Sequence, residues 1–136
     1  MKYVRIDSES ELPDISKLNP FRCIVVIEHK VSEERQYEIS GWLVVGGCLY
    51  MMAWGKDCSS WDSSVDDANL EAFDFNYIPE EKFVMTTWHD NEPLEEVFWF
   101  SKHCAFHPEV DLQEFVLVHI SSVDKESVFR ERFQNA

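Results

Sequence analysis

Between Arg22 and Trp54 the chain reads RCIVVIEHKVSEERQYEISGWLVVGGCLYMMAW, a stretch that decides the fold class. It opens with a β-branched run, RCIVVIE (Arg22 to Glu28), and closes with a second apolar run, CLYMMAW (Cys48 to Trp54). Between these runs Ser32 can cap a helix, and Gly46-Gly47 can stop it. Apolar runs of this length predict two buried strands, joined here by a helix.

The alternation of strand and helix continues along the rest of the chain. The pattern predicts a helix from about Ser59 or Ser60 to Phe73, a strand FVMTTW (Phe83 to Trp88), a helix capped by Asp90 or Asn91, a strand EFVLVHI (Glu114 to Ile120) and a last helix capped by Asp124. Strands that are apolar throughout and alternate with helices are typical of parallel sheets covered on both faces. We therefore expect one α/β domain over residues 21–136. Its four-stranded, mostly parallel sheet would be flanked by helices in a Rossmann-like arrangement of two or three layers. Residues 1–20 are polar and are expected to form an N-terminal lead-in.

The charge balance excludes several kinds of partner. The 136 residues include 12 Lys+Arg and 26 Asp+Glu, a formal net charge of −14. A phosphate backbone would repel such a chain, so direct nucleic-acid binding is not expected.

No apolar stretch approaches the roughly 18–20 residues that span a membrane, and the N-terminus does not read as a secretory signal. The sequence thus predicts a cytoplasmic protein whose acidic surface suits a basic protein partner.

Motifs for cofactors and disulfides are missing. Neither G-x-x-x-x-G-K-[ST] nor G-x-G-x-x-G occurs in the chain, and no cofactor is predicted. The four cysteines are widely spaced without a C-x-x-C pair, which favours reduced thiols. The sequence leaves the oligomeric state open.

The candidate site lies at one edge of the predicted sheet. Right-handed crossovers place every loop that follows a strand at the same edge, where open α/β sheets bind their ligands. The loops expected there are Glu28–Lys30, Trp54–Cys58, Thr86–Asp90 and His119–Ser122. They are rich in histidine, tryptophan and acidic residues.

A thiol and an imidazole in these loops suggest one possible chemistry. Cys58 lies between a strand end and a helix start, where amide dipoles can stabilise a thiolate. His89 comes from a neighbouring loop and could act as its base, oriented by Glu28, Asp57 or Asp90. The loop WGKDCSSWD lacks the glycines and arginine of a phosphate-binding cysteine loop, which argues against a phosphatase. The alternative is a half-buried structural cysteine.

Acidic and aromatic side chains at the same edge suggest a binding surface instead. Its candidate residues are Trp54, Asp57, Trp61, Asp62, Asp66, Trp88 and His89, with Asp67 nearby. Asp62 and Asp66 lie four residues apart on one helix face. Together with Asp57 they could bind Mg²⁺. A solvated acidic helix face is the simpler interpretation. The tryptophans could anchor a protein interface or fill the core.

Three further histidines suggest no metal site. His103 and His107 have the i, i+4 spacing of half a zinc site, but the glutamate of H-E-x-x-H is missing and Pro108 follows. His119 alternates within an apolar strand, which predicts a hydrogen-bonded core or edge residue rather than a ligand. No metal site is predicted.

Two longer strings resemble a known group of sequences. MAWGKDCSSWDSSVDDANL (Met52 to Leu70) and FVMTTWH (Phe83 to His89) resemble a family of small uncharacterised bacterial proteins, over about half of the chain. That resemblance implies no activity. In size, acidity and lack of a catalytic motif, the chain is also similar to immunity proteins of bacterial toxin systems, which neutralise a toxin by covering it.

Two functions follow as hypotheses. The first is a non-enzymatic binding protein, in the manner of an immunity protein, whose acidic and aromatic edge covers a basic partner such as a toxin. The second is a thiol-dependent hydrolase or ligand-binding enzyme, with Cys58 as nucleophile and His89 as base. We favour the first, because the edge loops offer few arginines or amide nests to stabilise a transition state.

Overall fold

Strand β2 (Phe21–Ile27) lies in the middle of the sheet and is buried along its whole length. Its residues alternate between two faces. Cys23, Val25 and Ile27 point into one apolar core, whereas Ile24 and Val26 point into the other. A strand that is covered on both faces needs apolar side chains at every position, which explains the unbroken run in the sequence.

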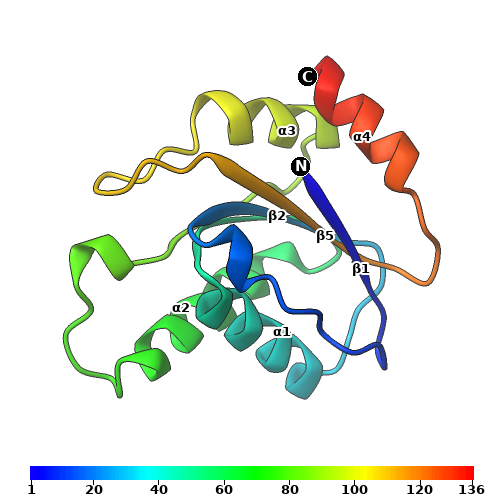
Figure 1. Ribbon diagram of the computed structural model, residues 1–136. Helices are drawn as coiled ribbons and strands as arrows, with labels where there is room; N and C mark the ends of the chain where they lie inside the picture. Colours follow the sequence, from blue (N-terminus) through cyan, green and yellow to red (C-terminus); the bar gives the residue numbers. More distant parts are fainter.

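The computed structural model describes residues 1–136, and Figure 1 shows them as three layers. Along the chain the elements are β1 (Lys2–Ile6), η1 (Ser16–Leu18), β2, α1 (Glu33–Gly46), β3 (Cys48–Gly55), α2 (Cys58–Ala72), η2 (Glu80–Lys82), β4 (Met85–Trp88), α3 (Leu94–His103), β5 (Glu114–Ile120) and α4 (Glu126–Asn135). The sheet has the order β1-β5-β2-β3-β4, and all of its neighbouring strands are parallel. The predicted α/β class and parallel sheet are therefore confirmed.

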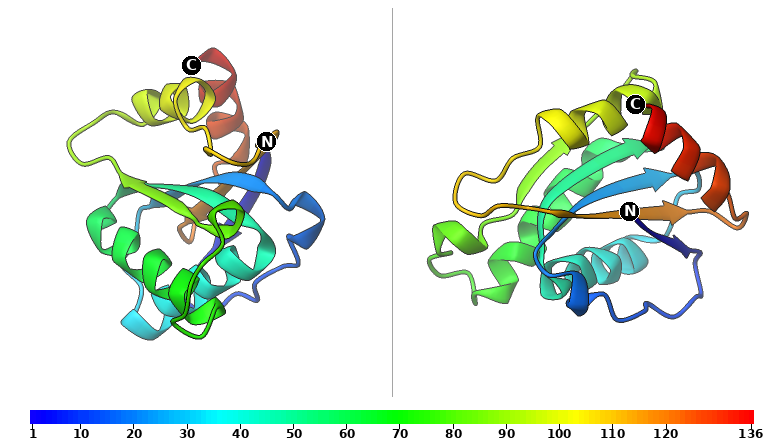
Figure 2. Two further views of the ribbon diagram at one scale, coloured as in Figure 1. Left: turned by 90° about the vertical axis from the view of Figure 1, so that its left-hand side faces the viewer. Right: turned by 45° about the horizontal axis from the view of Figure 1, so that its top comes forward.

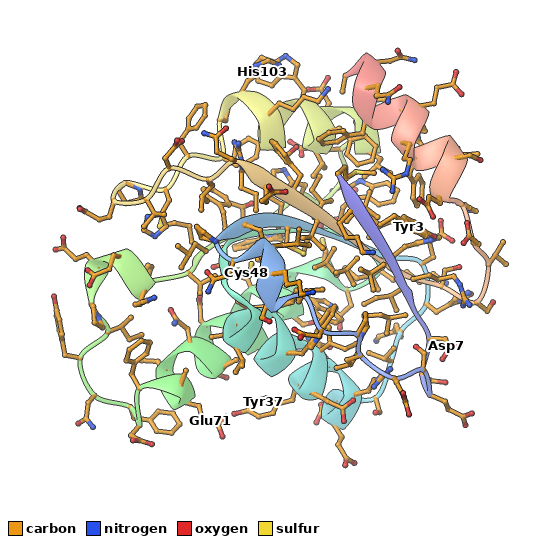
Figure 3. The ribbon with its side chains drawn as sticks, viewed as in Figure 1. Tyr3, Asp7, Tyr37, Cys48, Glu71 and His103 are labelled. Atoms are coloured by element: carbon orange, nitrogen blue, oxygen red, sulfur yellow. The ribbon has the colours of Figure 1, made fainter.

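Helices cover the two faces of the sheet in pairs. In Figures 1 and 2, α1 and α2 lie side by side on one face, whereas α3 and α4 cover the other. Ile39 and Leu43 of α1 and Trp61 and Val65 of α2 pack into the first core. Between these two helices the Tyr37 hydroxyl donates a hydrogen bond to Glu71, and both side chains are labelled in Figure 3.

The sheet has five strands, not the four that we expected from the sequence. The additional strand is β1, which lies within the N-terminal segment that we expected to be only a lead-in. Its residues Tyr3, Val4 and Ile6 are buried, and it pairs with β5 from Lys2↔Val116 to Ile6↔Ile120. The polar residues after Ile6 obscured this short strand in the sequence. It pairs with β5 alone and therefore forms one edge of the sheet.

The helix boundaries confirm some of the predicted caps and correct others. Ser32 caps α1 by accepting a hydrogen bond from the Arg35 amide, and Gly47 ends this helix with a left-handed φ of 107°. Asp90 and Asn91 do not cap α3, because they form a turn in which Asn91 has a left-handed φ of 61°, and the helix begins at Leu94 with Pro93 as its N-cap. The Asp124 carboxylate accepts from the Glu126 amide, although α4 starts one residue later than that cap requires.

A buried arginine fastens α3 to the sheet. The Arg22 guanidinium of β2 donates to the carbonyl of Ser101 at 3.0 Å and to that of Leu112 at 2.6 Å. It also stacks 4.1 Å from the ring centroid of Phe115. Burial lowers the pKa of Arg22, and the Asp111 charge raises it by less. The guanidinium thus satisfies carbonyls where α3 ends and the chain turns toward β5.

Gly55 provides a test of the backbone at the carboxyl end of β3. It has a φ of 111°, and a Cβ atom there would lie 2.2 Å from the carbonyl oxygen of Ile27. We expect Gly55→Ala to lower the free energy of unfolding by at least about 1–3 kcal/mol, the range for a strained backbone conformation. Gly41 in α1 is the matched control, because a Cβ there meets nothing within 4 Å. Gly41→Ala should stabilise the protein by about 0.5–1 kcal/mol. Urea unfolding of the two variants measures both effects, and equal values would contradict the prediction.

Candidate functional site

The carboxyl ends of all five strands meet at one edge of the sheet, as we expected for a parallel sheet. From β2 the chain passes into α1 on one face, and from β5 it passes into α4 on the other. These two strands are neighbours, so the direction of the connections reverses between them. Open α/β sheets bind ligands at such a switch point.

A chain of polar side chains occupies this switch point on the α4 side. The Tyr3 hydroxyl lies 2.6 Å from Nδ1 of His119, and it accepts a hydrogen bond from the Lys125 amide at 3.1 Å. On the other side of the imidazole, Nε2 lies 3.4 Å from a Glu28 oxygen. The Lys125 ammonium donates to the second Glu28 oxygen at 2.9 Å. His119 is thus the hydrogen-bonded core residue that its place in the strand predicted.

The protonation of this cluster follows from its burial. His119 has no exposed surface, and burial lowers its pKa, while the Glu28 charge raises it by less. The contact to Glu28 does not have hydrogen-bond geometry, and Nε2 has no other partner. For Glu28, burial raises the pKa, but Lys125 and His119 together outweigh it and lower the pKa overall. The cluster therefore pairs a carboxylate with an imidazole that resists protonation.

Cys58 begins α2 but is enclosed by the first core. Only 3% of its surface is exposed. Burial raises the pKa of the Cys58 thiol, and the nearby Asp90 charge raises it further. Backbone amides, including that of His89, act in the opposite direction but do not reverse the shift. The site therefore favours the thiol over the reactive thiolate.

The imidazole of His89 is held away from Cys58. Its Nε2 lies 2.9 Å from the Thr87 hydroxyl, and its Nδ1 lies 2.8 Å from a Glu92 oxygen. The ring packs edge-on against Phe100 of α3, on the opposite face of the sheet from Cys58. The side chains of Cys58 and His89 therefore do not meet, and Glu28 is brought to neither of them.

Asp62 and Asp66 lie on the outer side of α2, beside the edge strand β4. The Thr86 hydroxyl of β4 donates to Asp66 at 3.1 Å. Burial raises the pKa of Asp66, and the charges of Asp62 and Asp67 raise it further. None of these three aspartates forms a salt bridge. Like charges are therefore gathered here without a counterion from the chain.

Trp88 completes this surface at the end of β4. It lies two residues beyond Thr86 and so faces the same side of the strand as the Thr86–Asp66 contact. Half of the Trp88 side chain is exposed. We call Asp62, Asp66, Asp67, Thr86 and Trp88 the β4 surface.

The other predicted binding residues lie in different surroundings. Trp61 is 2% exposed and fills the first core, so it offers no surface to a partner. The Trp54 indole donates to the Glu92 carbonyl at 2.7 Å and packs against the second core. Asp57 is exposed before α2 with a left-handed φ of 53°, and one of its oxygens lies 3.9 Å from the Lys30 ammonium. Of the three tryptophans, Trp88 is the one that remains available as an anchor.

The acidic residues are more strongly segregated than the predicted group from Asp57 to Asp67 suggested. Between Lys56 and Lys102 the chain has 12 acidic residues and a single basic one, Lys82, so this segment carries −11 of the −14 net charge. It includes α2, η2, β4 and most of α3. A count of charges along the sequence is the signal that would have revealed it.

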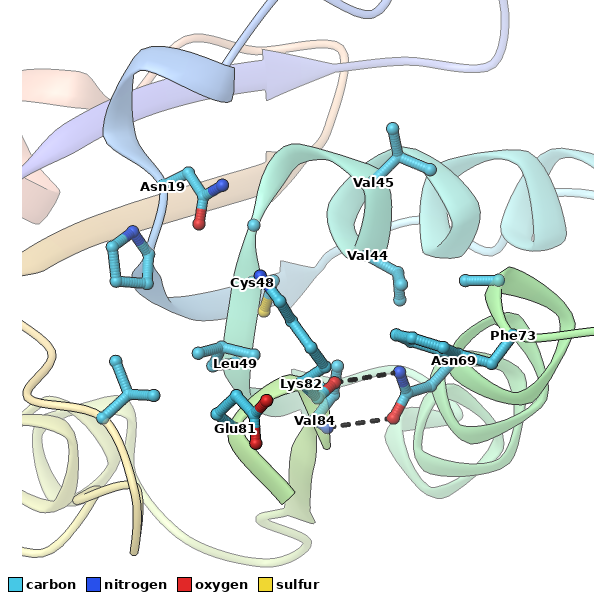
Figure 4. A pocket seen from close by; sticks show the side chains of 14 residues that line it. Asn19, Val44, Val45, Cys48, Leu49, Asn69, Phe73, Glu81, Lys82 and Val84 are labelled. Atoms are coloured by element: carbon cyan, nitrogen blue, oxygen red, sulfur yellow. Dashed lines mark hydrogen bonds between the residues drawn. The ribbon is translucent and has the colours of Figure 1, made fainter. Parts of the chain in front are cut away.

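A pocket at the opposite edge of the sheet was not predicted. It has a volume of about 420 Å³ and lies where α1 and α2 end, beside η2 (Figure 4). Asn69 holds one wall by accepting from the Val84 amide at 2.9 Å and donating to the Lys82 carbonyl at 3.2 Å.

His103 and His107, the pair with the i, i+4 spacing, have structural partners. His107 is buried, and its Nε2 lies 2.8 Å from the Phe83 carbonyl oxygen, while Nδ1 accepts from the Glu109 and Val110 amides. His103 is exposed, and its ring packs at a tilt against Trp99 of α3. No group of three or more His, Cys, Asp or Glu side chains is arranged to hold a metal ion.

The fold and its edges define a doubly wound α/β protein with an all-parallel sheet. Over residues 1–136 the chain matches the model of a family described as a domain of unknown function, DUF7684, and it belongs to that family. Comparisons with curated proteins and with solved structures gave no match. None of its helices combines the length and apolar character needed to cross a membrane.

The thiols provide a test of the enzyme hypothesis. Cys104 is exposed, whereas Cys23, Cys48 and Cys58 are buried. We expect one rapidly modified thiol per native chain near neutral pH, lost in Cys104→Ser and retained in Cys58→Ser. Labelling with a chromogenic disulfide measures the rates. Rapid labelling that disappears with Cys58→Ser would instead restore Cys58 as a candidate nucleophile.

The buried imidazole predicts a pH dependence of stability. As the pH falls below the ordinary histidine value of 6.5, the unfolded chain takes up a proton at His119 before the folded protein does. The free energy of unfolding should therefore fall with pH in this window and level off below the folded pKa. Relative to the native protein, His119→Gln should reduce this slope, by up to about 1.4 kcal/mol per pH unit.

Urea unfolding between about pH 7.5 and about pH 5.5 measures this slope above the range in which most carboxylates titrate. His103→Gln is the control, because it removes an exposed histidine instead. Equal slopes for the native protein and His119→Gln would contradict the assignment.

Proposed function

We propose that the protein is a non-enzymatic binding protein whose β4 surface takes a basic protein partner. The observation that carries this proposal is the unneutralised charge of Asp62, Asp66 and Asp67 beside the half-exposed Trp88. Clustered like charges weaken the folded state. A basic partner would remove that cost and would in addition be steered toward the surface.

The β4 surface also has the layout of an interface. Large aromatic side chains at the centre of a charged patch are frequent sites of high binding energy. Strand β4 has a free edge, because β3 is its only neighbour in the sheet. A basic partner can therefore contact the indole, the carboxylates and the strand edge at the same time.

More specifically, we propose an immunity protein that covers a basic toxin. The net charge of −14 and the small size support this form. The buried Cys58 and the distant imidazole of His89 give no observation in favour of the thiol-dependent alternative. The expected setting is the cytoplasm.

Charge reversal on the β4 surface tests the proposal. The immobilised protein is used to capture proteins from an extract of its source cells, and each captured basic protein is then purified and its affinity measured. We expect Asp62→Lys/Asp66→Lys to weaken that affinity at least about tenfold, because each changed residue repels a basic partner. Trp88→Ala should cost about 2 kcal/mol or more if the indole is an anchor.

The matched control is Glu9→Lys/Glu11→Lys, which changes the net charge equally at exposed positions outside the β4 surface. This control should bind nearly as well as the native protein. The association rate of the native protein should fall as salt is raised. If both double variants lost the same affinity for the partner, net charge alone would explain the loss, and a specific binding surface would be refuted. Failure to recover any basic protein that binds as a purified component would also refute it.

A further inference from the structure

The pocket at the amino edge of the sheet lies far along the strands from the loops considered above. Val44 of α1, Leu49 of β3, Phe73 after α2 and Val84 before β4 give it mostly apolar walls. Figure 4 shows these side chains around a common space. Its volume of about 420 Å³ falls in the range of small-molecule sites.

Two helices end at the wall of this pocket. α1 ends at Gly46 and α2 at Ala72, and residues from the last turn of each helix line the pocket. A helix carries partial negative charge at its C-terminus, which a lysine, arginine or histidine in the last turn usually offsets. Neither helix has a basic residue in its last turn, whereas α3 and α4 both do.

Two charged side chains of η2 complete the lining. The Glu81 carboxylate adds a negative charge and forms no salt bridge. The Lys82 side chain extends across the pocket in Figure 4, and it is the one cation in the lining. Asn69 fixes the backbone on both sides of Phe83, so this wall is formed before any ligand arrives.

We propose that this pocket binds an alkylammonium group, with its hydrocarbon part against the apolar walls and its charge near Glu81 and the two helix ends. Lys82 is the resident cation that such a ligand displaces. Hydrocarbon contacts supply the affinity, and the helix ends together with Glu81 select the sign of the charge. This site is separate from the β4 surface and does not depend on a protein partner there.

Calorimetric titration with two probes of equal length tests which sign of ligand charge the pocket binds. Hexylammonium and hexanoate carry the same hydrocarbon chain with opposite charges, and we expect hexylammonium alone to bind saturably. Glu81→Gln should weaken its binding about two- to fivefold, the effect of losing one partly screened charge. Lys82→Met should tighten it by a similar factor. Glu80→Gln is the matched control, because Glu80 is the neighbouring carboxylate of η2 and does not line the pocket.

A third probe distinguishes the source of the ammonium group. Tighter binding of hexylammonium than of Nα-acetyl-lysine amide assigns the pocket to a free amine, and the reverse order assigns it to a lysine side chain of a protein. Ala72→Phe, designed to fill the pocket, should abolish binding of both, and its unfolding curve shows whether it is folded. If Ala72→Phe is not folded, the Glu81→Gln and Lys82→Met variants still decide whether the amines bind in this pocket. Preference for hexanoate, or no saturable binding of either amine to the native protein and Lys82→Met up to about 10 mM, overturns the proposal.

Discussion

A sheet in which all strands run in the same direction must be covered on both faces, because each crossover places a connection against it. Here that constraint makes β2 apolar along its whole length and divides the interior into two cores. It also collects every strand end at one edge and the C-terminal ends of α1 and α2 at the other. Both candidate binding regions, the β4 surface and the amino-edge pocket, are consequences of this arrangement.

The edge strand β4 joins the fold to the distribution of charge. Free strand edges invite pairing with other chains, and charged side chains are a common protection. Asp62 and Asp66 stand beside this edge, so a second copy of the same acidic chain is repelled, whereas a basic chain is attracted. In the proposed function, protection of the edge and selection of a basic partner would therefore rest on the same carboxylates. Trp88 adds apolar area that protection alone does not require.

Much of the fold could be predicted because its elements have strong local signals. The runs at Arg22–Glu28 and Cys48–Trp54, the Ser32 cap and the stop at Gly46-Gly47 all lie where the sequence places them. Strand β1 was missed because the polar residues from Asp7 onward dominate the composition of the N-terminal segment. Its own residues Tyr3, Val4 and Ile6 are of the aromatic and β-branched types that favour strands, a signal that can be read from the sequence.

The candidate site was harder to predict because neighbouring loops do not share a face. Cys58 and His89 both follow strands at the carboxyl edge, yet one side chain enters the first core and the other packs on α3. Trp61 belongs to the core because it shares a helix face with Val65, four residues later, a spacing that can be read from the sequence. Predicting which tryptophan is exposed therefore requires knowing the helix face on which it lies as well as the edge of the sheet.

The helix dipoles distinguish the chemistry of the two edges. At the carboxyl edge, Glu33 and Glu34 occupy the first turn of α1, and Glu126 occupies that of α4, so their positive ends already have carboxylates beside them. Such ends are poor sites for a phosphate or another anion. At the amino edge the negative ends of α1 and α2 lack that compensation and have Lys82 nearby as the one cation of the pocket. Both proposals therefore involve positively charged partners, but at different scales: a basic protein surface would cover the carboxylates beside β4, whereas the pocket of about 420 Å³ would take a single ammonium group with its hydrocarbon chain.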